Sequence, residues 1–147
     1  MILSTAQEME AVGAAIAAQL RVGDIVALTG DLGAGKTTLA RGMLRALGHE
    51  GEVPSPSFAI VQPYEPPAVR LSLAHVDLYR LEDDGELDEL GLDDWLYDGA
   101  LVVEWPARLG AAMLARALSV AIDVTVDGAR VLTVTVPDAW ESRWPPR

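Results

Sequence analysis

The stretch Gly30-Asp31-Leu32-Gly33-Ala34-Gly35-Lys36-Thr37 decides the fold that this chain is expected to adopt. Glycine, glycine, lysine and threonine fall in it at the offsets of a Walker A loop, in which backbone N–H groups hold phosphate oxygens. Lys36 is also the only lysine in the sequence, since the other ten of the eleven basic residues are arginines. A compact, flexible ammonium reaches the β- and γ-phosphates of a nucleotide more easily than a planar guanidinium does. The pattern therefore indicates a phosphate-binding loop rather than a glycine-rich turn with an incidental lysine.

The segments on either side of this loop fit the strand–loop–helix context that a Walker A motif requires. Residues 25–28 form a short apolar run that predicts a buried strand, and residues 36–47 predict the helix that follows the loop. Further upstream, the hydroxyls of Ser4 and Thr5 predict the start of another helix, which we expect to run to Leu20.

Downstream of the loop, the sequence predicts two hairpins, a further buried strand and short helices. The strands are expected at residues 58–64, 69–76, 100–103, 118–126 and 130–136, and the helices within the acidic stretch after residue 82 and within 107–117. These elements together predict a single α/β domain over residues 1–147, a three-layer P-loop NTPase-like fold. Its central sheet should be mostly parallel, with the hairpins adding antiparallel strands at the edges. No element is predicted for residues 138–147.

Composition and charge narrow the possible functions. The chain has no cysteine, which excludes disulfides, zinc fingers and thiol catalysis. It has no signal-peptide pattern at its N-terminus and no apolar run long enough to cross a bilayer, so we expect a soluble, cytoplasmic protein.

The formal net charge is −11, and much of it lies between residues 82 and 98, where no basic residue intervenes. The acidic residues of this stretch are Glu82, Asp83, Asp84, Glu86, Asp88, Glu89, Asp93, Asp94 and Asp98. Phosphate backbones repel such a surface, so we expect little or no direct binding of nucleic acid by the chain alone. The stretch is either a solvated helical face or a docking surface for a partner.

Two carboxylates follow predicted strands, where a P-loop enzyme needs one to hold Mg²⁺ or to orient water. Glu104 follows the apolar run 101–103, which is the Walker B pattern with glutamate in place of aspartate. Asp77 follows the strand that ends at Val76. His75 alternates with Asp77, so both should point to the same face of the sheet, with His75 either structural or catalytic.

Other residues near the predicted site leave two readings open. Ser55 and Ser57 lie in the loop where GTPases carry a switch that senses the γ-phosphate, or they belong to a proline-rich turn. Arg80 could pair with phosphate or with the acidic stretch, and Trp105 could cover a nucleotide or simply pack. The Asn/Thr-Lys-x-Asp motif of guanine-specific GTPases needs a second lysine, which the chain lacks, so ATP is the expected nucleotide.

With these motifs in order, the sequence resembles the bacterial TsaE family. The resemblance is carried by residues 30–38, 55–58, 75–80, 86–91 and 103–106, and it covers about residues 20 to 109. It implies a small P-loop ATPase needed for threonylcarbamoyl modification of the adenosine next to the anticodon in tRNA. It also implies that the chain works with TsaD and TsaB proteins. In that picture ATP hydrolysis resets the transferase complex, and another subunit transfers the threonylcarbamoyl group.

The same resemblance assigns roles to individual residues. Thr37 and Glu104 would be Mg²⁺ ligands, and Asp77 would be needed for hydrolysis. With Lys36 of the Walker A loop, Asp77 and Glu104 form the expected catalytic set. The contacts to ATP or ADP would come from Gly33, Ala34, Gly35, Lys36, Thr37 and Thr38, and, by spacing alone, from Gln7 and Arg130. The chain departs from the family at Ser57, where threonine is usual, and at Ala59, where a further threonine is common.

Two other functions compete with this interpretation. A small-molecule or nucleotide P-loop kinase would share the loop, but the acidic stretch after the central strands would repel a phosphorylated acceptor. A nucleotide-binding module without hydrolysis is disfavoured by Asp77 and Glu104, which supply the carboxylates that hydrolysis requires.

Overall fold

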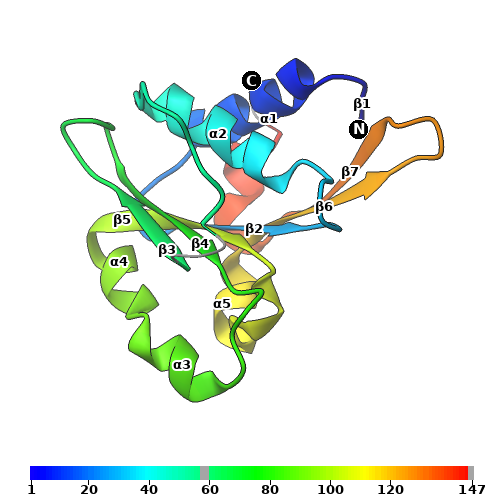
Figure 1. The fold of residues 1–147 in the computed structure, drawn as a ribbon. Helices are drawn as coiled ribbons and strands as arrows, with labels where there is room; N and C mark the ends of the chain where they lie inside the picture. The colour runs from blue at the N-terminus through cyan, green and yellow to red at the C-terminus, as the bar shows by residue number, and fades with distance from the viewer. Residues whose placement is uncertain (57–59, 146–147) are drawn as a thin grey trace.

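A twisted sheet forms the centre of the molecule, and the computed structural model describes residues 1–56 and 60–145 of the chain (Figure 1). In this described part the sheet has seven strands in the order β1-β7-β6-β2-β5-β4-β3. The strands are β1 (Ile2–Leu3), β2 (Ile25–Thr29), β3 (Val61–Tyr64), β4 (Ser72–Asp77), β5 (Gly99–Glu104), β6 (Leu118–Val124) and β7 (Arg130–Thr135). β6, β2, β5 and β4 run parallel, while β3, β7 and β1 pair antiparallel with their neighbours. A parallel centre with antiparallel additions confirms the predicted fold.

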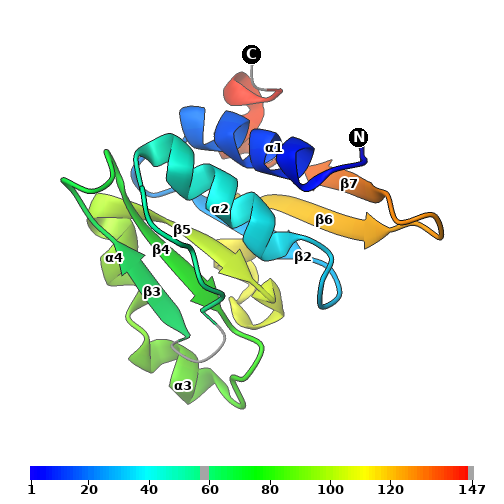
Figure 2. The same ribbon diagram turned by 45° about the horizontal axis from the view of Figure 1, so that its top comes forward.

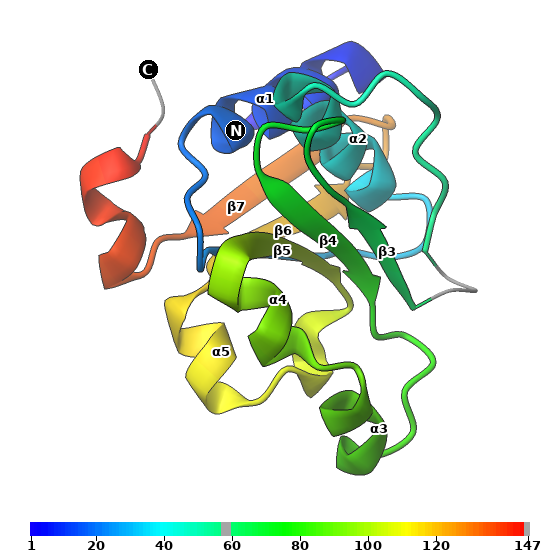
Figure 3. The ribbon, with the colours of Figure 1, turned by 90° about the vertical axis from the view of Figure 1, so that its left-hand side faces the viewer.

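Helices cover both faces of this sheet and complete the predicted three layers (Figures 2 and 3). The helices are α1 (Ala6–Ala18), α2 (Lys36–Leu47), α3 (Asp84–Glu89), α4 (Leu92–Asp98) and α5 (Ala111–Arg116), with 3-10 segments η1 (Pro106–Arg108) and η2 (Asp138–Arg143). α1 and α2 lie together on one face, and α3, α4 and α5 lie on the other. We call these the P-loop face and the acidic face.

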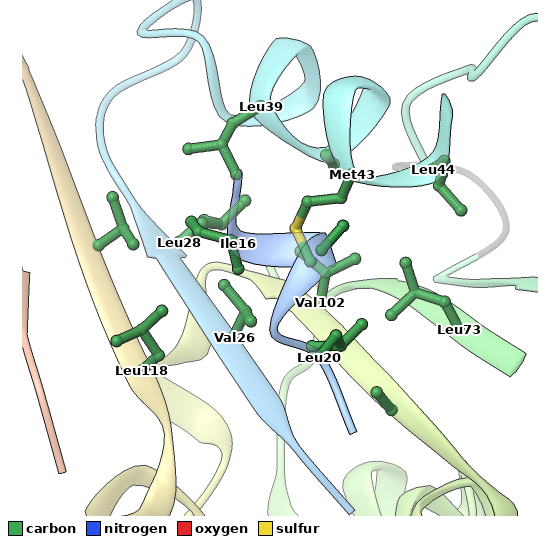
Figure 4. Close-up of a cluster of buried hydrophobic side chains, with 14 of the residues drawn as sticks. Ile16, Leu20, Val26, Leu28, Leu39, Met43, Leu44, Leu73, Val102 and Leu118 are labelled. Atoms are coloured by element: carbon green, nitrogen blue, oxygen red, sulfur yellow. The ribbon is translucent and has the colours of Figure 1, made fainter. Parts of the chain in front are cut away.

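Alternation along the central strands divides the core between the two faces, as the period of two requires. Val26 and Leu28 of β2 belong to the hydrophobic cluster on the P-loop face, whereas Ile25 and Ala27 belong to the cluster on the acidic face. Figure 4 shows Val26 and Leu28 beside Ile16 of α1 and other apolar side chains of the P-loop face. The same alternation in β4 and β5 decides which polar side chains face α2.

α1 and α2 pack closely because each carries a glycine at the crossing. A Cβ on Gly13 would lie 2.1 Å from the carbonyl oxygen of Leu39, and one on Gly42 would lie 2.1 Å from that of Glu10. The backbones of the two helices therefore touch directly, which no larger residue would allow.

Several boundaries differ from the sequence-based expectation. α1 ends at Ala18 rather than Leu20, although its predicted start is confirmed, since the Thr5 hydroxyl accepts a hydrogen bond from the Glu8 N–H at 3.1 Å. The first hairpin comprises Val61–Tyr64 and Ser72–Asp77. The predicted strand start at 58 and the predicted switch residue Ser57 lie outside the described residues. β1 and η2 were not predicted at all.

The C-terminal segment is tied to the body by a buried ion pair. Arg143 of η2 donates hydrogen bonds to both carboxylate oxygens of Asp24, at 2.6 and 3.0 Å. Its guanidinium also stacks on the buried ring of Trp140, which joins the core of the P-loop face. This segment is thus part of the fold and not an appendage.

Candidate nucleotide site

The Walker A loop connects β2 to α2 at the carboxyl edge of the parallel strands. Gly35 has a φ of 118°, which favours glycine, and it leads directly into the first turn of α2. Gly30 also needs its missing side chain, because a Cβ there would lie 2.8 Å from the carbonyl oxygen of Ile122. The loop therefore presents its backbone and the N-terminus of α2 to the space in front of it, as an anion site requires.

Lys36 is buried within this loop and is held by its backbone. Its ammonium donates hydrogen bonds to the carbonyl oxygens of Gly30 and Asp31, and it lies 4.2 Å from the centre of the Trp105 ring. Burial lowers the pKa of Lys36, while the negative charges of Glu104, Asp77 and Asp31 oppose that shift. The Lys36 ammonium is therefore only partly solvated and lies in the field of three carboxylates.

Glu104 and Asp77 lie side by side at the ends of β5 and β4, where they are register partners. Both are buried, and both face α2, because their strand neighbours Val103 and Val76 pack into the core of the acidic face. The Thr37 hydroxyl donates to the Glu104 carboxylate, with Oγ1 3.2 Å from Oε2 and 3.5 Å from Oε1. The two predicted metal ligands are therefore in direct contact.

His75 also reaches Glu104. It lies on the same face of β4 as Asp77, as the alternation predicted, and its Nε2 is 2.6 Å from Glu104 Oε2. Sequence reasoning placed His75 and Asp77 together but missed this bond across the strands. The alternation of side chains along β4 was the only sequence feature that pointed to this contact, because the pairing of β4 with β5 is a tertiary feature.

One cavity of about 250 Å³ unites most of the predicted site residues. It is lined by Leu32, Gly33, Gly35, Lys36, Thr37, Thr38, Ser55, Asp77, Glu104 and Trp105. Trp105 closes one side in the left-handed region of the backbone, with a φ of 57°, and its ring packs against Tyr79 at 4.8 Å between centres. Such backbone strain in a bulky residue is typical of functional sites.

A second, smaller cavity of about 170 Å³ lies on the other side of the loop. It contains Ala34, Gly35 and Thr38 of the loop, residues Ser4 to Ala6 before and within α1, and Arg130 of β7. The Arg130 guanidinium donates to the carbonyl oxygens of Ala34 at 2.8 Å and Gly33 at 3.3 Å. Sequence reasoning placed Arg130 near a nucleotide by spacing but missed that it braces the loop backbone.

Gln7 is exposed in the first turn of α1, next to Ala6, which lines this second cavity. Its predicted contact with the nucleotide stays a prediction.

The donor set at Thr37 and Glu104 suits Mg²⁺. Both groups offer oxygen, and Mg²⁺ in nucleotide sites takes one or two such protein ligands and completes its shell with phosphates and water. Within residues 1–56 and 60–145 the structure contains no cluster of three or more His, Cys, Asp or Glu side chains that could hold a metal alone.

Comparison with known proteins matches most of the chain to a family. The family described as "Threonylcarbamoyl adenosine biosynthesis protein TsaE" matches residues 3–132. The chain belongs to the TsaE family.

Members of the TsaE family from three bacteria are similar to this chain over most of their length. The chain is 41% identical over 132 residues to the "tRNA threonylcarbamoyladenosine biosynthesis protein TsaE" of Streptomyces coelicolor, covering 86% of this chain and 89% of that protein. The proteins of the same name are 38% identical in Mycobacterium leprae, covering 84% of this chain and 81% of that protein, and 37% identical in Bacillus subtilis, covering 88% and 80%.

The fold of the chain is also similar to that of a solved structure. The crystal structure of YdiB from Bacillus subtilis superposes with a TM-score of 0.77 and 31% identity, covering 92% of this chain and 83% of that one.

In the described part of the chain, none of the helices has the length and apolar character that a membrane span needs.

Proposed function

We propose that this chain is a Mg²⁺-dependent P-loop ATPase that acts in the cytoplasm as an ATP-driven switch in tRNA threonylcarbamoyladenosine biosynthesis. The observation that carries the proposal is the single cavity in which Lys36, Thr37, Asp77 and Glu104 meet in front of the Walker A loop. Relatives named for this pathway support the biological context.

Each residue of the cavity has a role that follows from its position. The N–H groups at the start of α2 and the Lys36 ammonium would bind the β- and γ-phosphates of ATP. Thr37 and Glu104 would hold Mg²⁺, which when bound neutralises charge on those phosphates. Asp77 would orient the water that attacks the γ-phosphorus as ADP leaves.

The proposed partners are proteins of the TsaD and TsaB type. A net charge of −11 and an acidic stretch without basic residues would make direct binding of tRNA by this chain weak at physiological salt. ATP would strengthen the association by ordering the segment around Ser55, which lines the cavity, and hydrolysis would relax that order. The participation of Ser57 is predicted from its position in the sequence, because this residue lies outside the described part of the chain.

ATP turnover in three mixtures tests this proposal against a P-loop kinase and a non-hydrolysing module. We expect slow hydrolysis by the chain alone, faster hydrolysis with TsaB and TsaD, and no phosphoryl transfer to added nucleotides or small alcohols. Transfer to an acceptor would establish a kinase instead. Absence of turnover in every mixture would leave only a binding module.

Two variants then separate the carboxylates. Glu104→Ala should lose the Mg²⁺-dependent part of ATP affinity, whereas Asp77→Ala should lower turnover more than binding. The matched control is Asp98→Ala, an exposed carboxylate at the end of α4, which should resemble wild type in both measurements. Wild-type Mg²⁺ dependence in Glu104→Ala would refute the metal assignment.

A further inference from the structure

His75 is the most deeply buried titratable side chain of the site. Its exposed fraction is 0%, and its one hydrogen bond within the described residues joins Nε2 to Glu104 Oε2 at 2.6 Å. Nδ1 is also buried and has no hydrogen-bond partner among those residues. The hydrogen bonding of this buried imidazole is therefore directed at one neighbour, the Glu104 carboxylate.

The direction of this bond follows from its partners. An ionised carboxylate can only accept hydrogen bonds, so the proton of the bond lies on Nε2. The same oxygen, Oε2, also accepts from the Thr37 hydroxyl at 3.2 Å. Two donors from different elements, β4 and α2, thus converge on one oxygen and fix the rotation of the carboxylate group. Without the histidine, the hydrogen bonds left to the Glu104 carboxylate among the described residues are the longer ones from Thr37, beside the attraction of the Lys36 ammonium.

We propose that His75 is a positioning residue that holds Glu104 in the orientation needed to bind Mg²⁺ with ATP. The inference rests on the proposed function, because it assigns to Glu104 the role of metal ligand. The physical reason is general: hydrogen bonds behind a metal ligand orient it, and their loss typically weakens metal affinity or activity by about 10–100-fold. His75 does not contact the nucleotide cavity itself, so its effect passes through Glu104.

A purely structural role is the competing explanation, since the bond also joins β4 to β5. The two roles predict different effects when the His75 bond is lost. Loss of a structural bond lowers the free energy of unfolding and weakens ATP binding equally with and without Mg²⁺. Loss of a positioning bond weakens ATP binding only when Mg²⁺ is present.

A pair of amide substitutions separates these roles. The amide nitrogen of glutamine is as many bonds from Cα as Nε2 of histidine, whereas that of asparagine is one bond closer to the backbone. His75→Gln can therefore still donate to Glu104, and His75→Asn cannot reach it. ATP affinity is measured by titration calorimetry on the full chain, with excess Mg²⁺ and with EDTA, after thermal melts confirm that each variant is folded.

We expect His75→Asn to weaken ATP affinity in Mg²⁺ by about tenfold or more while leaving affinity in EDTA unchanged. His75→Gln should recover most of the loss. Val76→Ala, a buried change on the opposite face of β4, controls for destabilisation and should keep the wild-type ratio of the two affinities. If His75→Asn keeps that ratio as well, or if His75→Gln fails to recover it, the inference is overturned.

The Glu104→Gln background provides the second measurement. If His75 acts through Glu104, His75→Asn should cause no further loss of Mg²⁺ dependence in that background. An independent loss there would contradict the inference while leaving the proposed ATPase intact. Absence of any Mg²⁺-dependent ATP binding by the wild-type chain would instead refute the proposed function, and the inference with it.

Discussion

The two faces of the sheet differ in the lengths of the helices that cover them and in the number of buried apolar residues. On the P-loop face, α1 and α2 have 13 and 12 residues, and the adjoining cluster contains 24 buried apolar residues of the described chain. On the acidic face, α3, α4 and α5 have 6, 7 and 6 residues, and the cluster contains 12. α5 has no buried residue at all among those described.

The candidate site lies on the face that has the longer helices and the larger buried cluster. His75, Asp77 and Glu104 are buried polar residues that point toward α2, and Lys36 opens that helix. Groups that must meet within hydrogen-bonding distance need neighbours that cannot shift, because interiors of native density transmit small displacements. The short helices α3 and α4 of the acidic face instead carry exposed carboxylates, among them Asp88, Asp93 and Asp94.

The largest effect should come from removing the lysine of the Walker A loop, on the P-loop face. Lys36→Ala would lose the proposed charge-assisted hydrogen bonds to two phosphates, each worth about 1.5–3 kcal/mol, so ATP affinity should fall roughly a hundredfold or more. Lys36→Arg should also fail, because the larger fork does not fit the cradle. Arg108→Ala in η1, an exposed cation, is the matched control, and fluorescence or calorimetric titration with ATP gives the comparison. Normal ATP turnover by Lys36→Arg would contradict the argument that lysine is required.

An intermediate effect, on the free energy of unfolding, should appear when a helical glycine is replaced by alanine on each face. Gly42→Ala forces a Cβ to within 2.1 Å of the Glu10 carbonyl oxygen, and we expect it to lower the free energy of unfolding by about 1–3 kcal/mol or more. Gly85→Ala in α3 meets only the Asp83 side chain, at 3.2 Å, and should change stability by less than about 1 kcal/mol, with alanine favoured by helix propensity. Urea denaturation of both variants measures the difference. Equal destabilisation would show that the faces do not differ in tolerance.

The smallest effect on stability should come from neutralising the acidic face. Asp93→Asn with Asp94→Asn removes two exposed charges from α4, and the free energy of unfolding should change by no more than about 0.5 kcal/mol for each substitution. ATP affinity should stay at the wild-type value. Co-sedimentation with TsaD and TsaB distinguishes the two interpretations of the stretch: weaker association identifies a docking surface, and unchanged association identifies a solvated face.

Local features of the sequence predicted the elements that depend on neighbours in the chain. The Walker A loop between β2 and α2, the cap at Thr5 and the hairpin of β6 with β7 were all readable, because each is fixed by residues a few positions apart. β1 was not, since two residues form a strand only when β7 pairs with them. η2 was missed for a similar reason: Arg143 gains its partner Asp24 across 119 positions.

The candidate site divides in the same way. The sequence by itself determined which chemical groups are available: one lysine behind a glycine-rich loop, a hydroxyl after it, and carboxylates after two apolar runs. Only the tertiary structure decided that β4 lies beside β5, which makes Glu104 a register partner of Asp77 and brings His75 Nε2 to 2.6 Å from its carboxylate. Periodicity fixes the face on which a side chain lies, because the backbone repeats every two residues in a strand. It cannot fix which strand comes next in the sheet, because that order is set by packing among segments far apart in the chain.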